Sequence, residues 1–177
     1  MGRRALRARP PGASRSHTMT HVLAATGDNW LELSTEPLKA EHALEWAERP
    51  SCGAVACFVG TVRDHAEGRT GVQAIDYEAY VDQVLPRFEA IVAAAREHWP
   101  EIGRAAVWHR IGRLKLGEAS VVVVVSTPHR AEAFEACRYM IDTLKATTPI
   151  WKRETWAGGT DWSPEARPIE EPPEVGR

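Results

Sequence analysis

Four short segments place cationic side chains beside ordered or glycine-containing backbone, a combination that suits the binding of an anion. The first is Gly60-Thr61-Val62-Arg63, at the end of a predicted strand, and the second is Ser126-Thr127-Pro128-His129-Arg130, where a strand meets the start of a helix. The free N–H groups and positive dipole end of a helix N-terminus favour negative charge. Lys145 lies in the last turn of the same helix, and Trp151-Lys152-Arg153-Glu154 lies on the strand that follows.

Each of these segments also has an ordinary structural explanation. Arg63 is explained equally well as a loop charge, and His129-Arg130 as a solvated first helical turn. Lys145 belongs to a polar stripe of its helix, and a lysine near a helix C-terminus is favourable anyway. Lys152 and Arg153 point to opposite faces of a strand, so at least one of them can lie on the surface. Charge spacing alone therefore leaves both an anion site and a charged surface open.

The length of the helix predicted over residues 128–146 constrains any shared site. At 1.5 Å per residue it is about 27 Å long, so Arg130 and Lys145 of one chain cannot meet in one small pocket. If both serve the same site, either the ligand is extended or a symmetry-related copy supplies one end. A homodimer would do this.

The elements that would position these residues follow from hydrophobic periodicity and from glycine and proline. Strands are predicted over residues 30–33, 52–62, 72–80, 104–111, 119–127 and 150–156. Helices are predicted from an N-cap at Thr35 to residue 48, with Pro37 in the first turn, and over 82–99 and 128–146. Residues 63–71 are predicted to form an exposed loop and 112–117 a turn.

Two of the predicted helices carry an apolar stripe at helical spacing. In the helix over 82–99 the stripe consists of Val84, Leu85, Phe88, Ile91, Val92 and Ala95. In the helix over 128–146 it consists of Phe134, Cys137, Ile141 and Leu144. Three helices among mixed strands indicate an α+β fold, with the helices packed on a mixed, largely antiparallel sheet.

The length of 177 residues suits a single domain, which we expect over residues 21–162. Residues 1–20 contain five arginines and no acidic residue. A targeting peptide is one interpretation; we favour a disordered basic extension, with Met19 as the true start. Residues 163–177 contain four prolines and four glutamates, which predicts a flexible tail.

Charge and cysteine usage exclude some classes of function. The formal net charge is −2, and without the five N-terminal arginines it is −7, because 17 basic residues then face 24 acidic ones. This acidity argues against non-specific nucleic-acid binding. No apolar run approaches the roughly 20 residues that span a bilayer. The three cysteines match no zinc spacing, and we expect Cys52, Cys57 and Cys137 to be small core residues in a reducing cytoplasm.

Taken together, five separate motifs resemble the MoaE family, the large subunits of molybdopterin synthases. The resemblance spans roughly residues 30–167, and the motifs occur in the family's order with similar spacing. The motifs are Phe58-Val59-Gly60-Thr61-Val62-Arg63, His109-Arg110-Ile111-Gly112, His129-Arg130 with Ala133-Phe134-Glu135-Ala136, Leu144-Lys145, and Pro149-Ile150-Trp151-Lys152-Arg153-Glu154.

This resemblance implies a reaction and a partner. Such enzymes convert a cyclic pyranopterin monophosphate, precursor Z, into molybdopterin by installing the two sulfurs of a dithiolene. The sulfur arrives as a thiocarboxylate on the C-terminal Gly-Gly tail of a small ubiquitin-like subunit. The resemblance further implies an α/β-hammerhead-like fold with a homodimeric core, a small subunit at each end, a cytoplasmic location, and no metal or cofactor.

The family's functional residues carry over to matching positions of this sequence. Lys145 matches an essential lysine and Lys152 a second, supporting lysine, so the resemblance makes these two the expected catalytic pair. The expected substrate-binding residues are these two lysines together with Thr61, Val62, Arg63, His129, Arg130, Arg153 and Glu154. In the family the pair matching His129-Arg130 comes from the other protomer. Arg167 resembles a further basic position.

The residue types suit the implied chemistry. Arginines can bind phosphate oxygens bidentately, and a nearby ammonium stabilises charge on the oxygen that departs when the cyclic phosphate opens. Two alternatives remain open from the sequence. One is a non-catalytic dimeric α+β module that binds an anionic metabolite, and the other is a subunit that only docks a ubiquitin-like protein.

Overall fold

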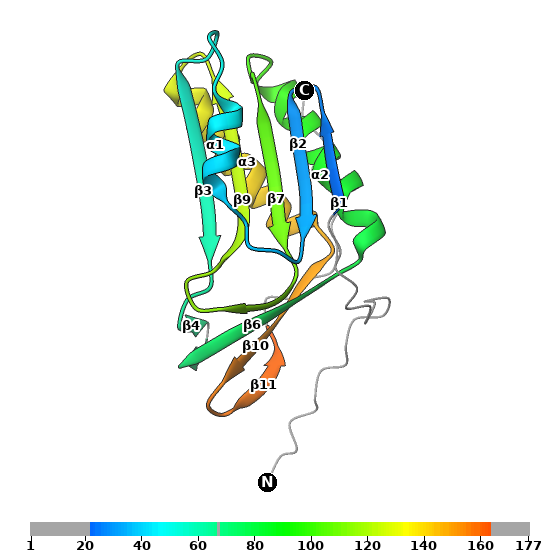
Figure 1. Ribbon diagram of the computed structural model, residues 1–177, viewed down its shortest axis with the longest axis vertical. Helices are drawn as coiled ribbons and strands as arrows, with labels where there is room; N and C mark the ends of the chain where they lie inside the picture. Colours follow the sequence, from blue (N-terminus) through cyan, green and yellow to red (C-terminus); the bar gives the residue numbers. More distant parts are fainter. Residues whose placement is uncertain (1–21, 67, 164–177) are drawn as a thin grey trace.

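A five-stranded sheet forms the centre of the computed structural model, which describes residues 22–66 and 68–163 (Figure 1). Its neighbouring strands are antiparallel except for one parallel pair, β2 with β7. The strand order is β1 (Val22–Thr26), β2 (Asn29–Ser34), β7 (Ala105–Arg110), β9 (Ala119–Thr127) and β3 (Ala54–Thr61). β9 lies inside the sheet, and its residues from Ser120 to Thr127 are all buried, as its continuous apolar run predicts.

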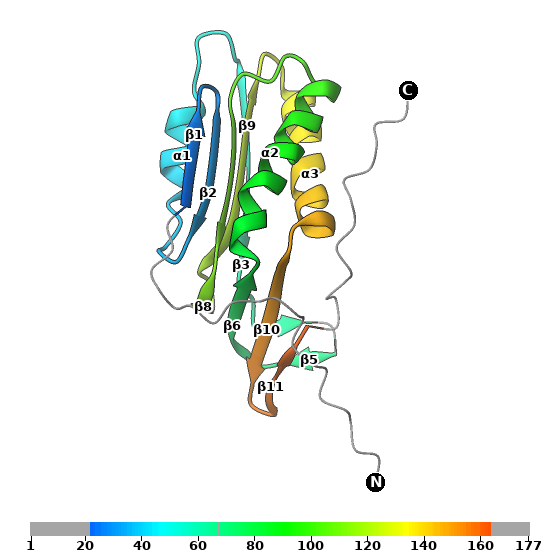
Figure 2. The same ribbon diagram turned by 90° about the vertical axis from the view of Figure 1, so that its right-hand side faces the viewer.

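Helices cover both faces of this sheet, as the turned view shows (Figure 2). On one face, α2 (Val81–His98) and α3 (Arg130–Thr147) pack over a core that includes Phe88, Ile91 and Met140. On the other face, the short helix α1 (Ala40–Ala47) covers a smaller core around Trp108. The apolar stripes of the long helices therefore decide which face each helix buries.

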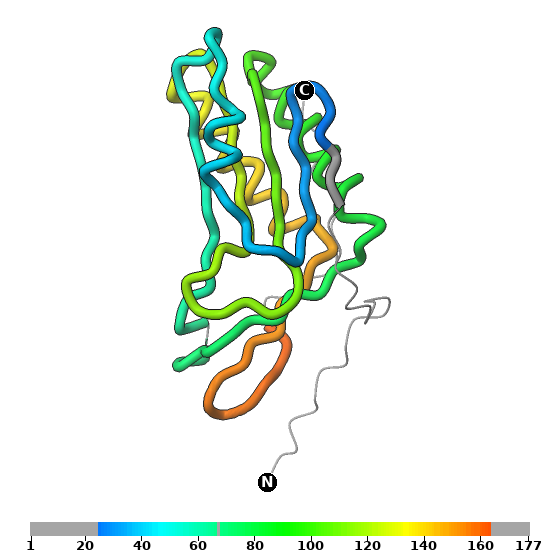
Figure 3. Tube along the Cα trace, viewed as in Figure 1, coloured from blue at the N-terminus to red at the C-terminus, as the bar shows by residue number. Residues whose placement is uncertain are grey.

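A second, four-stranded antiparallel sheet adjoins one end of the first (Figure 3). Its strand order is β11 (Gly159–Trp162), β10 (Ile150–Trp156), β6 (Val72–Ala79) and β8 (Gly112–Lys115). A two-stranded hairpin, β4 (His65–Ala66) with β5 (Arg69–Thr70), lies beside it. The second sheet has a small core of its own, formed by Val62, Val72, Ile75 and Leu114.

The α+β class, the three helices and most of the strands agree with the sequence-based expectations. β9 and β10 have the predicted bounds, and the α2 bounds differ from the prediction by one residue at each end. Proline ends α3 as expected. The residue before Pro149, Thr148, has an extended backbone (φ −83°, ψ 133°), because the proline ring disfavours the helical conformation there.

The start of α1 and one residue of the α3 stripe were predicted wrongly. The helix begins at Ala40, not after Thr35, and its N-cap residue is Lys39. The Thr35 carbonyl accepts a hydrogen bond from Arg110 Nε, which ties this segment to β7. Phe134 is 68% exposed. The other three predicted residues, Cys137, Ile141 and Leu144, are buried, and the stripe also includes Ala133, Ala136 and Met140.

Two segments expected to lack regular structure contain strands. Residues 63–71 include the β4–β5 hairpin, and residues 112–117 include β8, which pairs with β6. Gly112 has φ +88°, a left-handed conformation that lets the chain turn directly from β7 into β8. β1 and β11 were not predicted either. In β8, pairing with the distant β6 overrides the weak β preference of a short polar segment.

The cysteines are less uniformly buried than expected. Cys137 is buried, but Cys52 is half-buried and Cys57 is exposed on the edge strand β3. Of the three cysteines that we expected in the core, only Cys137 lies there.

Part of the sequence-based interpretation lies outside the described residues. This applies to the basic extension over residues 1–20, to Arg167 and to the tail beyond Ser163. Ser163 itself is buried, and its N–H donates to the Lys152 carbonyl. Among the described residues, no helix is both long and apolar enough to cross a membrane.

Candidate active site

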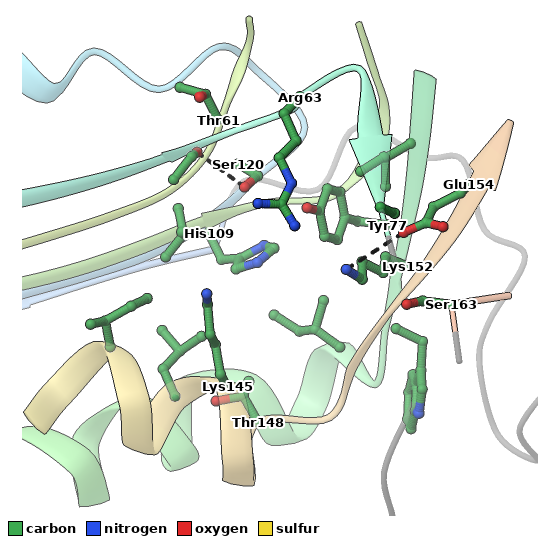
Figure 4. Close-up of a pocket in the computed structure, with 18 of the residues that line it drawn as sticks. Thr61, Arg63, Tyr77, His109, Ser120, Lys145, Thr148, Lys152, Glu154 and Ser163 are labelled. Carbon is green, nitrogen blue, oxygen red and sulfur yellow. Dashed lines mark hydrogen bonds and ion pairs between the residues drawn. The ribbon is translucent and has the colours of Figure 1, made fainter. Parts of the chain in front are cut away.

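A cavity of about 760 Å³ opens where the two sheets and the C-terminal end of α3 meet. Its walls come from the ends of β3, β7 and β9, from the middle of β6, from the last turns of α3, and from β10. The close-up shows cationic side chains reaching into the same space from several of these elements (Figure 4). Segments that are distant in sequence therefore build one pocket.

Lys145 and Lys152 reach this pocket from either side of a tight connection. α3 ends at Thr147, and after Thr148 and Pro149 the chain enters β10 at Ile150. Backbone hydrogen bonds hold the connection, from the Tyr80 N–H to the Pro149 carbonyl at 3.1 Å and from the Ile150 N–H to the Thr148 carbonyl at 2.8 Å. The lysines thus face one cavity although one is helical and the other lies on a strand.

Lys145 is exposed at the mouth of the cavity. Its Nζ lies 5.9 Å from the centroid of the Phe58 ring, within the range of a cation–π interaction. The aliphatic stem of a lysine can lie against apolar surface while its ammonium stays in water. The ammonium is accessible to a ligand, because Lys145 is exposed and lines the cavity.

Lys152 lies next to a fully buried carboxylate. Its Nζ is 3.5 Å from Oε1 of Glu154, which is 0% exposed. The other oxygen, Oε2, accepts a hydrogen bond at 2.7 Å from Nη1 of Arg69. A buried carboxylate is tolerated when it is paired and hydrogen-bonded. Arg69 supplies the hydrogen bond at Oε2, and Lys152 supplies an opposite charge at Oε1, which has no hydrogen bond of its own among the described residues.

Arg69 connects the β4–β5 hairpin to the strands of the second sheet. Its Nη2 donates to the Trp162 carbonyl at 3.0 Å, and its guanidinium lies 4.5 Å from the centroid of the Trp156 ring. The side chain is only 14% exposed. The hairpin that the sequence placed in an exposed loop therefore anchors the strand that carries Lys152.

Thr61 and Arg63 lie at the end of β3, on the opposite wall. The β3–β9 register shifts between Gly60 and Thr61, and a Cβ at Gly60 would lie 2.6 Å from Cγ1 of Val121. Only glycine permits this close approach. Arg63 Nε donates to the His65 carbonyl at 3.0 Å, which orients the guanidinium at the pocket.

Buried His109 and half-buried Tyr77 form another part of the wall. His109 is 5% exposed, and its Nδ1 donates to the Arg110 carbonyl at 2.8 Å. Its ring meets the Tyr77 ring edge to face, with centroids 5.1 Å apart. Burial lowers the pKa of His109 to about 4, because the charged imidazolium loses its hydration. The ring is therefore neutral at neutral pH.

The structure brings together only some of the predicted site residues. Five of them line the cavity, namely Thr61, Arg63, Lys145, Lys152 and Glu154. Val62 does not line it, because its side chain belongs to the small core of the second sheet. Arg153 points to the other face of β10, where its Nη2 lies 3.9 Å from Asp76. His129 and Arg130 are exposed at the far end of α3 and do not line the cavity of their own chain.

Several lining or supporting residues were not identified as site residues from the sequence. His109 stood in a motif but received no role, and neither Tyr77 nor Arg69 was singled out. Their importance depends on pairings between distant segments, such as Arg69 with Glu154, which are 85 positions apart. The one sequence signal was the His109-Arg110 motif itself.

The arrangement can bind an anionic, partly apolar ligand. Arg63, Lys145 and Lys152 supply positive charge from three directions. Phe58, Ile75 and Ile150 supply apolar lining, and His109 supplies a neutral acceptor. A concave site that combines apolar walls with a few polar groups is typical of a small-molecule pocket.

The chain is similar to proteins of one family. Residues 33–147 match the family model described as MoaE protein. A protein named molybdopterin synthase catalytic subunit from Taeniopygia guttata is 40% identical over 134 residues, which cover 76% of this chain and 86% of that protein. A protein of the same name from Nostoc sp. is 44% identical over 124 residues, which cover 70% of this chain and 74% of that protein.

Solved structures agree with these relatives. The crystal structure of molybdopterin synthase from Staphylococcus aureus superposes with a TM-score of 0.70 at 34% identity and covers 74% of this chain and 94% of that chain. A protein–protein complex of subunits 1 and 2 of the molybdopterin-converting factor from Helicobacter pylori contains a chain with a TM-score of 0.65 at 23% identity, covering 78% of this chain and 94% of that chain. At that identity, the second likeness concerns the fold.

Proposed function

The chain belongs to the MoaE protein family, and from this membership we propose that it is the catalytic subunit of a molybdopterin synthase. It takes a cyclic pyranopterin monophosphate as substrate and installs two sulfurs to form the dithiolene of molybdopterin. The reaction is a sulfur transfer, and this chain supplies the pocket in which it takes place.

The observation that carries this proposal is the convergence of Lys145, Lys152 and Arg63 on one cavity. The substrate carries a cyclic phosphate and the sulfur donor is a thiocarboxylate, so two anions must approach each other. Their mutual repulsion is reduced when cations surround both. A cavity of about 760 Å³ lies within the range of ligand pockets.

The two lysines have different surroundings, which suggests different roles. Lys145 is exposed at the cavity mouth, so we assign it to positioning the thiocarboxylate and to proton transfer. Lys152 is anchored beside buried Glu154, so we assign it to stabilising charge on the phosphate oxygen or on the thioester-like intermediate. Thr61 and Arg63 complete the phosphate side, since a guanidinium can bind phosphate bidentately.

The sulfur donor is a small ubiquitin-like subunit whose C-terminal Gly-Gly tail ends in a thiocarboxylate. In each transfer the thiocarboxylate sulfur forms a carbon–sulfur bond to the substrate as a carbon–oxygen bond of the substrate breaks. In one transfer the departing oxygen stays on the phosphate as the cyclic phosphate opens, and in the other it leaves as water. Water then cleaves the acyl–sulfur bond, which releases the small subunit with an ordinary carboxylate. The extended Gly-Gly tail has no bulky side chains, so it can enter the cavity mouth beside Lys145.

We also propose that two copies of this chain form a homodimer in which each pocket receives His129 and Arg130 from the partner. α3 has 18 residues, so its two ends lie about 27 Å apart. A second copy can bring the exposed N-terminal cations to a pocket that their own chain cannot reach. The free cysteines suit a reducing cytoplasm, where we place the enzyme.

Reconstitution tests the proposed function. The full chain is mixed with the cyclic pyranopterin monophosphate and a thiocarboxylated small subunit, and the dithiolene product is followed by mass spectrometry. Turnover is the expected result. Substrate binding without turnover would instead indicate a binding module, and association with the small subunit alone would indicate a docking protein.

A matched control uses the small subunit with an ordinary C-terminal carboxylate. It presents the same tail and the same surface, but it has no sulfur to give. Product that forms equally well with this control would mean that sulfur comes from another source, and the proposed reaction would be wrong.

A further inference from the structure

His109 is the buried titratable group of the pocket to which the proposed chemistry gives no role. It follows Trp108 at the end of β7 and is 5% exposed. The cavity is lined by its ring, which lies in the space between Arg63 and Lys145 in Figure 4. Its packing edge to face against Tyr77 limits the orientations that the ring can adopt.

A backbone hydrogen bond decides which nitrogen of His109 carries the proton. Nδ1 lies 2.8 Å from the Arg110 carbonyl oxygen, and a carbonyl can only accept, so Nδ1 must donate. The ring is neutral at neutral pH, since burial lowers the pKa of His109 to about 4. Nε2 therefore has a lone pair and can only accept a hydrogen bond from a ligand.

The charged side chains around His109 do not offer a neutral hydrogen-bond acceptor. Arg63, Lys145 and Lys152 can only donate. The buried carboxylate of Glu154 is charged and paired with cations. Its Oε2 accepts a hydrogen bond from Arg69, and its Oε1 lies 3.5 Å from Nζ of Lys152 without a hydrogen bond in the described part of the chain. The pocket therefore supplies strong donors for an anion and, in His109, a neutral acceptor whose orientation the fold sets.

A pterin needs such an acceptor. Its ring system carries amine and amide N–H groups, and an N–H that leaves water without a partner is unfavourable. The phosphate, in contrast, can be bound by the cationic side chains. The two halves of the substrate thus match two kinds of group in the cavity.

We propose that Nε2 of His109 accepts a hydrogen bond from an N–H group of the pterin ring and thereby orients the substrate in the pocket. This inference rests on the proposed function, because it takes the pyranopterin as the ligand. His109 is then a specificity-determining residue, which recognises the ring while Arg63 and Lys152 hold the phosphate.

Calorimetric titration of the full chain tests this inference with two probes, the cyclic pyranopterin monophosphate and inorganic phosphate. His109→Phe keeps an aromatic ring against Tyr77 but has no acceptor. It should weaken binding of the pyranopterin about 10- to 100-fold, the range expected when a buried donor loses its partner. Binding of inorganic phosphate should stay unchanged. His98→Phe, on the exposed end of α2, is the matched control and should leave both affinities as they are.

A second pair of variants separates the two nitrogens. Glutamine can place its amide oxygen near the position of Nε2, whereas asparagine can replace only the Nδ1 side of the ring. His109→Gln should retain most of the pyranopterin affinity, and His109→Asn should lose it. This pair also serves if His109→Phe does not fold.

Three results would overturn the inference. Equal pyranopterin affinity in all His109 variants would make the residue purely structural. Equal weakening of both probes would assign His109 to the phosphate or to the fold. Equal losses in the Gln and Asn variants would exclude an acceptor at Nε2. If the wild-type chain neither binds nor converts the pyranopterin, the proposed function fails as well, whereas normal wild-type turnover confines the failure to His109.

Discussion

The two ends of α3 carry similar cations in very different surroundings. At the N-terminal end, His129 and Arg130 are exposed and do not line the cavity of their own chain. At the C-terminal end, Lys145 borders a cavity that strands of both sheets and a second lysine help to enclose. Both ends looked equally suitable for an anion from sequence. The difference shows that a cation becomes part of a site through the segments brought to it.

The topology explains why only one end has a pocket. The C-terminal end of α3 lies where the second sheet adjoins the first, so β6 and β10 add walls there (Figure 1). The N-terminal end lies at the opposite end of the five-stranded sheet, beyond the reach of the second sheet. In the proposed homodimer, a partner copy brings the exposed end to a pocket.

Removing the ammonium at the pocket end should have the largest effect. We expect Lys145→Ala to reduce dithiolene formation about 10³-fold, as for the loss of a group that stabilises developing charge. Binding of the small subunit, measured by gel filtration, should be retained. Arg138→Ala is the control, because Arg138 is 85% exposed on the same helix. Near-normal turnover by Lys145→Ala would contradict a catalytic role for the C-terminal end of α3.

The ion pair between Arg69 and Glu154, which supports the pocket at the C-terminal end of α3, should contribute to the free energy of unfolding. We expect Arg69→Gln to lower the free energy of unfolding by about 3 kcal/mol, because the buried Glu154 loses its closest partner. Arg130→Gln at the exposed end should change it by less than about 0.5 kcal/mol. Chemical denaturation measures both. A small effect of Arg69→Gln would mean that the carboxylate is not held by this pair.

The buried ring beside the pocket should make stability depend on pH. The pKa of His109 is lowered from 6.5 to about 4 in the folded chain, so between these values the unfolded chain binds more protons. Stability is thus complete above pH 6.5 and is lost as the pH falls toward 4, by up to about 3 kcal/mol. His109→Phe should remove this part of the pH dependence. An unchanged pH profile would contradict the buried, neutral ring.

Arg130 should have the smallest effect on activity, and it offers a direct test of the proposed dimer. We expect Arg130→Ala to reduce turnover about tenfold, consistent with one lost charge-assisted contact. In a dimer of one Lys145→Ala chain and one Arg130→Ala chain, one pocket would have both wild-type residues and the other neither.

Mixing the two variants therefore distinguishes the arrangements. Subunit exchange should raise activity above the mean of the two separate variants if the partner supplies Arg130. Activity equal to that mean, with exchange confirmed by native mass spectrometry, would count against a shared pocket. The N-terminal end of α3 would then have no part in the reaction.

Long, strongly patterned segments of this protein were predictable from sequence. β9, β10 and α2 were located within a residue, from a continuous apolar run, an alternating pattern and a helical stripe respectively. The short strands β1, β4, β5, β8 and β11 were not predicted. β8 pairs with the distant β6, and the others form hairpins that are too short to show a clear alternation. Phe134 was misassigned because positions three and four residues before Cys137 both lie near the same helix face, and only Ala133 is buried there.

The sequence by itself determined the class of fold, the family motifs and the lysines, because these depend on local pattern and on residue types in order. Only the tertiary structure decided which cations share a cavity, that Glu154 is buried against Arg69, and that His109 is a neutral acceptor. These properties arise from distance and desolvation, and both depend on segments that meet only after folding. Lys145 and Arg130 illustrate this, because they carry similar charges on one helix and only Lys145 faces the cavity of its own chain.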